Sequence, residues 1–371
     1  MIVTEIKNAD VYFGNGALDE AEQKICGLGG KALVVSGAHA ADISGAYRDI
    51  CILLEKHGIG HARYAQIREN PSVTSCYEGA ALGREEDCDF VIAVGGGSAM
   101  DAGKAAAFYL TNPEAGKEDI FHITEDMNRP APLVAVPTTA GTGSEANRYS
   151  VLTEDGGLKK HTYKSSLSYP DISAVCPKYT YSLPEQYTLS TALDAFAHSI
   201  ESYLSPKSTD HSRKLASEAA GLIWNILKRE KAPLDIDEAG REDLSKAAML
   251  AGAAIDVTGT GFPHPMGYGL TLGYGVPHGS ACAVFEDAYI RYNMITAEGR
   301  RLIAGFCGGL EVSPEELGAK LVALSGVRMH ISREKAEELI SRVENASNFS
   351  NSPYILSRGE MLDIYKRQFK N

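Results

Sequence analysis

The sequence predicts a protein in two parts, an α/β half followed by an all-helical half. In the first half, short and almost entirely apolar runs alternate with helix-like segments, and two of these runs lead directly into glycine-rich turns. Apolar strands that alternate with helices indicate a parallel sheet covered on both faces. After about Pro184, helical periodicity replaces this alternation. We therefore expect one domain over residues 1–180 and a second over residues 181–371.

The first half contains elements in the order expected for such a sheet. Its apolar runs are short and rich in Val, Ile and Ala, as buried strands are. The intervening segments have the length and spacing of helices. We expect strands at 31–37, 61–67, 89–98 and 131–145, the last two ending in glycine-rich turns, and helices at 46–58 and 78–88.

The second half shows helical periodicity throughout. Ser313 followed by Glu316 has the pattern of a capping box, whereas Ser332 lacks the acid that a box requires because Lys335 stands there. We expect helices at 189–205, 217–230, 241–255, 313–326 and 332–346.

Composition excludes several classes of protein. The net charge of −12 over 371 residues argues against nucleic acid or an anionic membrane surface as the main partner. No stretch approaches the ~20 apolar residues of a membrane span, and the N-terminus lacks the pattern of a signal peptide. The seven cysteines are scattered without a CxxC, so neither a disulfide framework nor a thiolate zinc site is indicated. We expect a cytoplasmic protein.

The two glycine turns have the chemistry of a ligand cradle. In VIAVGGGSAMDAGK (91–104), a strand ends in glycines and Ser98 can cap the following helix, whose free N–H groups favour anions. The turn PTTAGTGSE (137–145) adds hydroxyl groups from Thr138, Thr139 and Thr142. Two such turns at successive strand ends suit a dinucleotide lying across the carboxyl edge of a sheet. The alternative is a pair of tight turns without a ligand.

Four residues in the second half have the chemistry of a metal site. Asp194 and His198 lie four positions apart on one face of the predicted helix. His264 and His278 stand in a glycine-rich stretch of a chain with only ten histidines. One carboxylate and three imidazoles fit Fe(II) or Zn(II). Spacing alone leaves open whether the two pairs meet, and an ordinary Asp–His pair on a helix surface is the alternative.

The motifs GGGSAMDAGK, PTTAGTGSE, ALDAFAHSIESYLS and VPHG, in this order, resemble those of the iron-containing (group III) alcohol dehydrogenases. The resemblance extends over most of the chain. It implies a Rossmann-like dinucleotide-binding domain, a helical metal-binding domain of dehydroquinate synthase-like architecture, and an active site in the cleft between them. The implied activity is metal-dependent hydride transfer between a small alcohol or aldehyde and NAD(H) or NADP(H).

The resemblance also implies roles for individual residues. Asp194, His198, His264 and His278 match the metal ligands, His264 and His278 therefore also being catalytic. Asp101 and Lys104 fit the first motif, with ligand contact and turn geometry both open. The residues that match cofactor contacts are Asn70, Gly96, Gly97, Ser98, Thr138, Thr139, Thr142 and Lys160.

Two positions depart from the family pattern. Many relatives carry a histidine four residues after the third ligand, where this chain has Tyr268. We expect Tyr268 either to donate a hydrogen bond or relay a proton, or to form a wall of the substrate pocket. NAD-preferring relatives often have Asp in place of Gly37, and an acid there repels the 2′-phosphate of NADP. Gly37 therefore predicts that NADP(H) is accepted, unless it only shapes a turn.

Other functions remain open on the same scaffold. A polyol dehydrogenase of the glycerol type has a similar architecture. A dehydroquinate synthase-like lyase needs more cationic groups than residues 259–280 supply. A third alternative is a non-catalytic nucleotide or metal sensor. A homodimer or larger homo-oligomer is common in such families, but no feature of the sequence proves one.

Overall fold

The computed structural model describes the chain except residues 1–2, 4–5, 7–8, 156–158, 230–235 and 370–371. It forms two compact units, each described below by itself. The first unit comprises Met1–Leu183 and Asp237–Met249, and the second comprises Pro184–Ile236 and Leu250–Asn371. No described helix is both long and apolar enough to cross a membrane.

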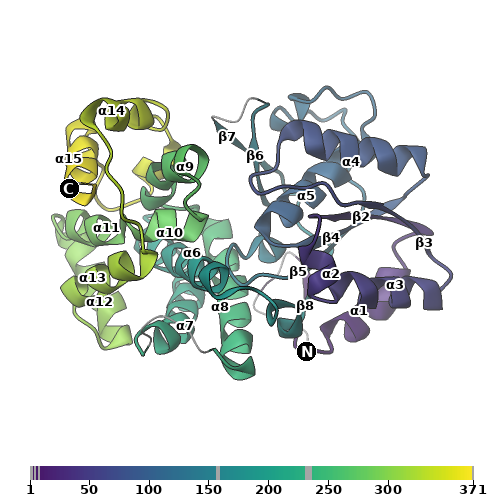
Figure 1. The fold of residues 1–371 in the computed structure, drawn as a ribbon, viewed down its shortest axis with the longest axis horizontal. Coiled ribbons are helices and arrows are strands. Elements are labelled where there is room, and N and C mark those ends of the chain that lie inside the picture. Colours follow the sequence, from purple (N-terminus) through teal and green to yellow (C-terminus); the bar gives the residue numbers. More distant parts are fainter. Residues whose placement is uncertain (1–2, 4–5, 7–8, 156–158, 230–235, 370–371) are drawn as a thin grey trace. The chain divides into compact units, whose positions relative to one another are not determined.

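The first unit is built on a six-stranded parallel sheet (Figure 1). The strand order is β1-β8-β5-β4-β2-β3, so the order reverses beside β2 and β4. A separate antiparallel pair, β6–β7, follows β5 in the chain. The strands are β1 (Asp10–Phe13), β2 (Lys31–Ser36), β3 (Gly60–Tyr64), β4 (Phe90–Gly95), β5 (Leu133–Pro137), β6 (Tyr149–Thr153), β7 (Lys160–Lys164) and β8 (Ile172–Val175).

Both faces of this sheet are covered, as the apolar runs predict. Alternate residues of the central strands enter two different apolar clusters, so that Val91 faces one side of the sheet and Ile92 the other. The first cluster includes side chains of α4 and α5, and the second includes those of α1 and α3. The helices are α1 (Ala17–Cys26), α2 (Ala40–Ile43), α3 (Ala46–Lys56), α4 (Val73–Glu85) and α5 (Gly97–Thr111), with short 3-10 turns η1 (Asp119–Phe121), η2 (Ser144–Ala146) and η3 (Pro177–Thr180).

The second unit is helical in every part that the structure describes (Figure 1). Helix α6 packs closely against α7 and α10. The predicted capping box of Ser313 and Glu316 is present, and Ser332 caps its helix without a reciprocal partner. The elements are α6 (Glu185–Leu204), α7 (Asp210–Leu227), α9 (Pro263–Tyr274), α10 (His278–Ala283), α11 (Glu286–Asn293), α12 (Ala297–Leu310), α13 (Pro314–Ser325), α14 (Arg333–Ser341), η4 (Ser347–Ser350), α15 (Arg358–Gln368) and the end of α8 (Glu238–Thr258), whose residues up to Met249 belong to the first unit.

The predicted fold class is confirmed, and the differences concern single elements. Every strand and helix expected from the sequence is present, with bounds shifted by a few residues, although residue 230 lies outside the described residues. The edge strand β1, the strand β8 and the pair β6–β7 were not predicted. The helices that were not predicted are α1, α2, α9, α10, α11, α12 and α15. Of these, α9 is rich in glycine and proline, which are poor helix formers.

Candidate metal centre

Helix α6 places Asp194 and His198 side by side in the interior of the second unit. Both side chains are buried, with 3% and 5% of their surface exposed. The i,i+4 spacing puts them on one face, and Nε2 of His198 lies 3.8 Å from Oδ1 of Asp194. A surface ion pair, the alternative left open by the sequence, is therefore ruled out.

Helix α10 brings His278 to the same point because it packs against the backbone of α6. A Cβ atom at Gly279 would lie 1.8 Å from the carbonyl oxygen of Ser190 and 2.7 Å from the backbone nitrogen of Asp194. Only glycine permits this approach. His278, the first residue of α10, then has its Nε2 3.8 Å from Oδ1 of Asp194.

Helix α9 contributes His264, again through a close approach of backbones. A Cβ atom at Gly267 would lie 2.8 Å from the carbonyl oxygen of Ala281 in α10. This contact seats α9 against α10 and leaves His264 buried, with its Nε2 3.5 Å from Oδ1 of Asp194. The glycines of residues 259–280 thus serve to pack the helices that carry the two histidines.

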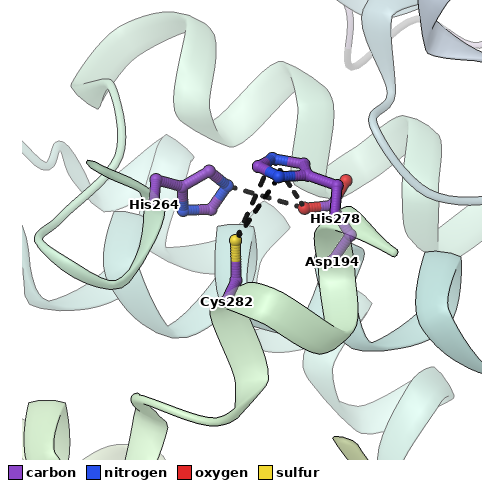
Figure 2. A group of neighbouring side chains, drawn as sticks. All are labelled: Asp194, His264, His278 and Cys282. Atoms are coloured by element: carbon purple, nitrogen blue, oxygen red, sulfur yellow. Dashed lines mark hydrogen bonds and ion pairs between the residues drawn. The ribbon is translucent and has the colours of Figure 1, made fainter. Parts of the chain in front are cut away.

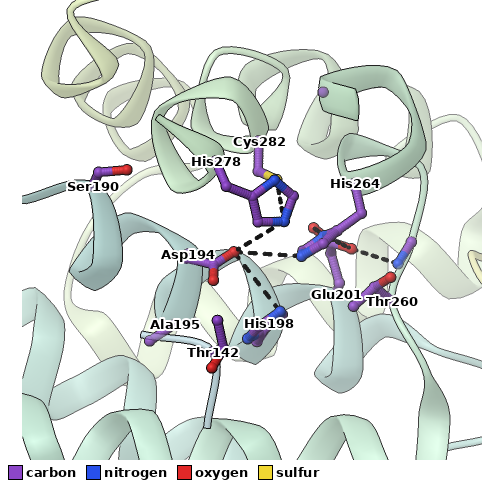
Figure 3. Close-up of polar contacts among 12 residues, drawn as sticks. Thr142, Ser190, Asp194, Ala195, His198, Glu201, Thr260, His264, His278 and Cys282 are labelled. Carbon is purple, nitrogen blue, oxygen red and sulfur yellow. Dashed lines mark hydrogen bonds and ion pairs between the residues drawn. The ribbon is translucent and has the colours of Figure 1, made fainter. Parts of the chain in front are cut away.

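The side chain of Glu201 fixes the orientation of His264. Both carboxylate oxygens of Glu201 lie 2.9 Å from Nδ1 of His264, and the Glu201 side chain is fully buried (Figure 3). Nδ1–H therefore donates to the carboxylate, and this hydrogen bond turns Nε2 toward Asp194. Carboxylate–histidine pairs of this kind orient imidazoles toward metal ions.

Asp194, His264 and His278 come together with a cysteine, whereas His198 contacts Asp194 but does not belong to this group. Ligand atoms of Asp194, His264, His278 and Cys282 all lie within 4.8 Å of one another (Figure 2). Nitrogen and oxygen ligands about 2.0–2.2 Å from one tetrahedral cation are about 3.4 Å apart. The observed separations from Asp194, 3.5 and 3.8 Å, are close to this value.

Buried atoms of the site have no hydrogen-bond partner, as is expected of atoms that bind a cation. Among the described residues, no hydrogen-bond partner is present for Oδ1 of Asp194 or Nε2 of His264, although both atoms are buried. Buried polar atoms without partners are costly and rare. The carboxylate and the two imidazoles would hold Fe(II) or Zn(II) well, since both ions accept this mixture of ligands.

The pKa values reflect burial and the charged groups packed around Asp194. Burial opposes the charged form of Asp194, but His198, His278 and His264 outweigh it and lower the pKa of this carboxyl. Burial lowers the pKa of His198 to about 4, so its imidazole is neutral, as a ligand must be. For His264 burial is outweighed by Cys282, Glu201 and Asp194, which raise its pKa.

A second carboxyl group lies behind Glu201. Glu286, on α11, is 1% exposed. Burial raises the pKa of Glu286 well above its ordinary value, and the charge of Glu201 adds to this effect.

Tyr268 borders the cluster from α9. Its ring stacks on that of His278, with centroids 6.0 Å apart and planes inclined by 25°. Burial raises the pKa of Tyr268 to about 12, so the phenol keeps its proton at neutral pH.

In the first unit, the two predicted glycine turns lie against each other at the carboxyl ends of β4 and β5. Gly96 packs against Thr139, and Gly97 packs against Thr142. The hydroxyl oxygen of Thr138 is buried without a hydrogen-bond partner among the described residues. Helix α5 begins at Gly97, so its free N–H groups open onto this edge of the sheet.

Asn70, Ser98, Gly37 and Lys160 lie in the same unit. The backbone N–H of Asn70, whose φ is 56°, donates to Oγ of Ser98 at 3.2 Å, joining the loop after β3 to the turn after β4. Gly37 directly follows β2, the neighbour of β4. Lys160, on β7, lies near enough to Asp101 for its charge to act on that carboxyl.

Asp101 and Lys104 both take part in the geometry of the second turn. Nζ of Lys104 donates to the carbonyl oxygens of Ser144 and Tyr149 and to Oγ of Ser144, each at 2.7 Å. Asp101 accepts hydrogen bonds from Oγ of Ser144 and the backbone N–H of Val151. Both side chains thus fasten the second turn to α5.

Sequence reasoning missed Glu201 and Cys282. Glu201 lies seven residues after Asp194, two helical turns along the same face, a spacing that would have suggested a supporting role. Cys282 follows His278 by four residues on α10, the same i,i+4 relation that singled out Asp194 and His198.

Comparison with known proteins agrees with this description. Residues 8–177 match the iron-containing alcohol dehydrogenase family, and residues 188–369 match the C-terminal region of the Fe-containing alcohol dehydrogenase family. The NADPH-dependent butanol dehydrogenase of Clostridium saccharobutylicum is 28% identical over 98% of this chain and 87% of its own length.

Solved structures show the same similarity over the whole chain. An iron-containing alcohol dehydrogenase from Thermotoga maritima has a TM-score of 0.89 at 31% identity, with 98% of each chain covered. Sulfoacetaldehyde reductase from Bifidobacterium kashiwanohense, solved with NAD+, has a TM-score of 0.86 at 28% identity over 100% of each chain. The chain belongs to the iron-containing alcohol dehydrogenase family and is a metal-dependent, NAD(P)-linked oxidoreductase that acts on CH–OH groups.

Proposed function

We propose that this enzyme interconverts a small alcohol and its aldehyde at a metal ion held by Asp194, His198, His264 and His278. The observation that carries this proposal is the buried group of carboxylate and imidazole atoms without hydrogen-bond partners among the described residues. When bound, the metal supplies Lewis-acid polarisation of the substrate oxygen.

The surrounding residues prepare the site for this reaction. Asp194 supplies negative charge from a fully buried position, and Glu201 holds His264 with Nε2 toward the other ligands. Tyr268 keeps its proton and stacks on His278, so it serves as a wall of the substrate site and as a hydrogen-bond donor. A buried site of this kind excludes water, which strengthens every electrostatic interaction within it.

We propose that the dinucleotide binds at the carboxyl edge of β2, β4 and β5, where the strand order reverses. The contacts of the two glycine turns with each other support this location, because they gather backbone N–H groups and hydroxyls at one edge. The proposed contact residues are Gly37, Asn70, Gly96, Gly97, Ser98, Thr138, Thr139, Thr142 and Lys160.

Gly37 leads us to propose that NADP(H) is accepted. The name of the Clostridium relative specifies NADPH, whereas the Bifidobacterium relative was solved with NAD+. Gly37→Asp should lower kcat/KM for NADPH relative to NADH because the carboxylate repels the 2′-phosphate. Gly37→Ala is the matched control, since a Cβ there already lies 3.2 Å from the carbonyl oxygen of Ile67. Equal losses in both variants would contradict the charge explanation.

A panel of alcohols and aldehydes tests the proposed reaction. The protein is loaded with Fe(II) or Zn(II) and assayed with NADH and NADPH. We expect turnover of small primary alcohols or aldehydes that depends on the metal. NADPH binding is measured by fluorescence. Tight binding without turnover of any member of the panel would contradict the proposal and favour a nucleotide sensor.

Three further features belong to the same proposal. We propose a domain boundary near residues 180/181, a cytoplasmic location and assembly into a homodimer or larger homo-oligomer. Sedimentation velocity of the purified chain tests the assembly, because a monomer at micromolar concentration would contradict it.

A further inference from the structure

Cys282 lies among the residues of the metal centre, although the cysteine spacing in the sequence gives no indication of a thiolate site. Its side chain is fully buried. Sγ lies 3.9 Å from Nε2 and 4.0 Å from Nδ1 of His278 (Figure 2). It is also within 4.8 Å of the ligand atoms of Asp194 and His264.

Helical spacing positions this sulfur, as it positions the predicted ligands on α6. His278 and Cys282 stand four residues apart on α10, as Asp194 and His198 do on α6. The glycine contact between these two helices therefore turns both pairs toward one centre. The other six cysteines belong to no comparable group within the described part of the chain.

We propose that Sγ of Cys282 is a ligand of the metal in the substrate-free enzyme, together with Asp194, His264 and His278. The inference rests on the proposed metal site and puts a sulfur donor in place of His198 as its fourth ligand. On binding, the S–H bond breaks, a sulfur–metal bond forms from the electron pair left on sulfur, and the proton passes to solvent.

The distances agree with such a ligand. Sulfur at about 2.3 Å and nitrogen at about 2.0 Å from one tetrahedral cation are about 3.6 Å apart. The observed 3.9 Å between Sγ and Nε2 of His278 is a few tenths longer. The other interpretation of a buried cysteine is a small apolar residue that packs in the core. It does not explain why Sγ lies within 4.8 Å of the ligand atoms of Asp194, His264 and His278.

Cys282 completes a group of four donors, and His198, 3.8 Å from Asp194, is a further candidate beyond what a four-coordinate site uses. A catalytic site must also keep a position for its substrate. His198 and Cys282 are thus alternative fourth donors, and a thiolate favours Zn(II) or Co(II) over the harder Fe(II). The sulfur ligand predicts that this chain retains zinc in preference to iron.

Cobalt substitution provides the test, because Co(II) reports its ligands by absorption. The full-length protein is loaded with one equivalent of Co(II), with d–d bands monitoring the site and near-ultraviolet thiolate-to-cobalt charge transfer monitoring sulfur. We expect both signals in the wild type. Cys282→Ser and Cys282→Ala should lose the charge-transfer band and keep the d–d bands. Cys307→Ala, which changes another buried cysteine of the second unit, should keep both.

X-ray absorption of the zinc-loaded wild type supplies a measurement that needs no variant. We expect one sulfur scatterer at about 2.3 Å from zinc. Bound metal with only nitrogen and oxygen neighbours, and no charge-transfer band with cobalt, would overturn the assignment of Cys282 while leaving the proposed function intact. Failure to bind cobalt or zinc at all would overturn both.

Discussion

Each of the two units buries a cluster of charged side chains. The clusters differ in whether the buried polar atoms have hydrogen-bond partners. In the first unit, Lys104 is 1% exposed and its ammonium donates three hydrogen bonds of 2.7 Å to Ser144 and Tyr149. In the second unit, Asp194 is 3% exposed, and its Oδ1 has no hydrogen-bond partner among the described residues.

This difference separates a structural cluster from a ligand site. A buried charge that the chain itself satisfies holds backbone segments together, as Lys104 holds the turn after β5. A buried charge that the chain leaves unsatisfied is costly unless something else binds there. Both clusters lie on family motifs, so a motif alone does not tell which role its charged residues have.

The largest expected effect is loss of the metal in the second unit. His264→Ala should abolish metal binding and lower kcat/KM by at least ~10³-fold, because a Lewis acid contributes several kcal/mol to the barrier. Metal content by atomic absorption and turnover with the best substrate measure the effect. Circular dichroism should remain close to that of the wild type. A variant that kept its metal and its activity would show that His264 is not a ligand.

The next largest effect is a loss of stability when the buried ammonium of Lys104 is removed from the first unit. Lys104→Met leaves the acceptors at Ser144 and Tyr149 without a donor, and removal of one partner from a buried charged network costs about 3–5 kcal/mol. Chemical denaturation should show the loss, with the metal content unchanged. Lys56→Met, which removes an exposed ion pair with Glu22, is the control and should leave stability nearly unchanged. Equal stability of the two variants would contradict the structural role of Lys104.

Glu145 gives the first unit a pH dependence of known sign. Burial raises the pKa of this carboxyl from 4.5 to about 7. The folded protein therefore holds the proton more tightly than the unfolded chain does. Its free energy of unfolding falls as the pH rises from about 4.5 through about 7. Glu145→Gln should remove a penalty of about 3 kcal/mol at pH 8 and have little effect at pH 4. Denaturation at both values checks this, and a gain independent of pH would contradict it.

The smallest expected effect comes from the hydrogen bond between Glu201 and His264 at the metal site. Glu201→Gln keeps the shape of the side chain but removes the charge that holds Nδ1–H of His264. The affinity for Zn(II) should fall about 10–100-fold, as for other residues that orient metal ligands. Competition with a chromophoric chelator measures it. An unchanged affinity would mean that the helix packing alone orients His264.

The sequence predicted what depends on local pattern. The apolar runs at 31–37 and 89–98 gave the strands of the sheet, because strands buried on both faces are apolar throughout. The resemblance brought His264 and His278 to Asp194, which spacing alone left open. The pairing of β1 with β8 was not predictable, because it joins residues about 160 positions apart in the chain.

Other features escaped prediction because they depend on packing. Glu201 looks like a surface residue of a helix, whereas in the folded unit it is fully buried against His264 of α9. Cys282 looks like one of seven scattered cysteines until α10 is seated on α6. Gly279 is the sequence signal for this packing, because a glycine directly after His278 lets α10 lie against the backbone of α6.

The most direct test of the metal centre is anomalous diffraction from crystals of the zinc-loaded protein, recorded on both sides of the zinc absorption edge. We predict a single strong peak about 2 Å from Oδ1 of Asp194 and from Nε2 of His264 and His278. Stoichiometric zinc whose peak lies away from these three atoms would contradict the assignment of the metal site.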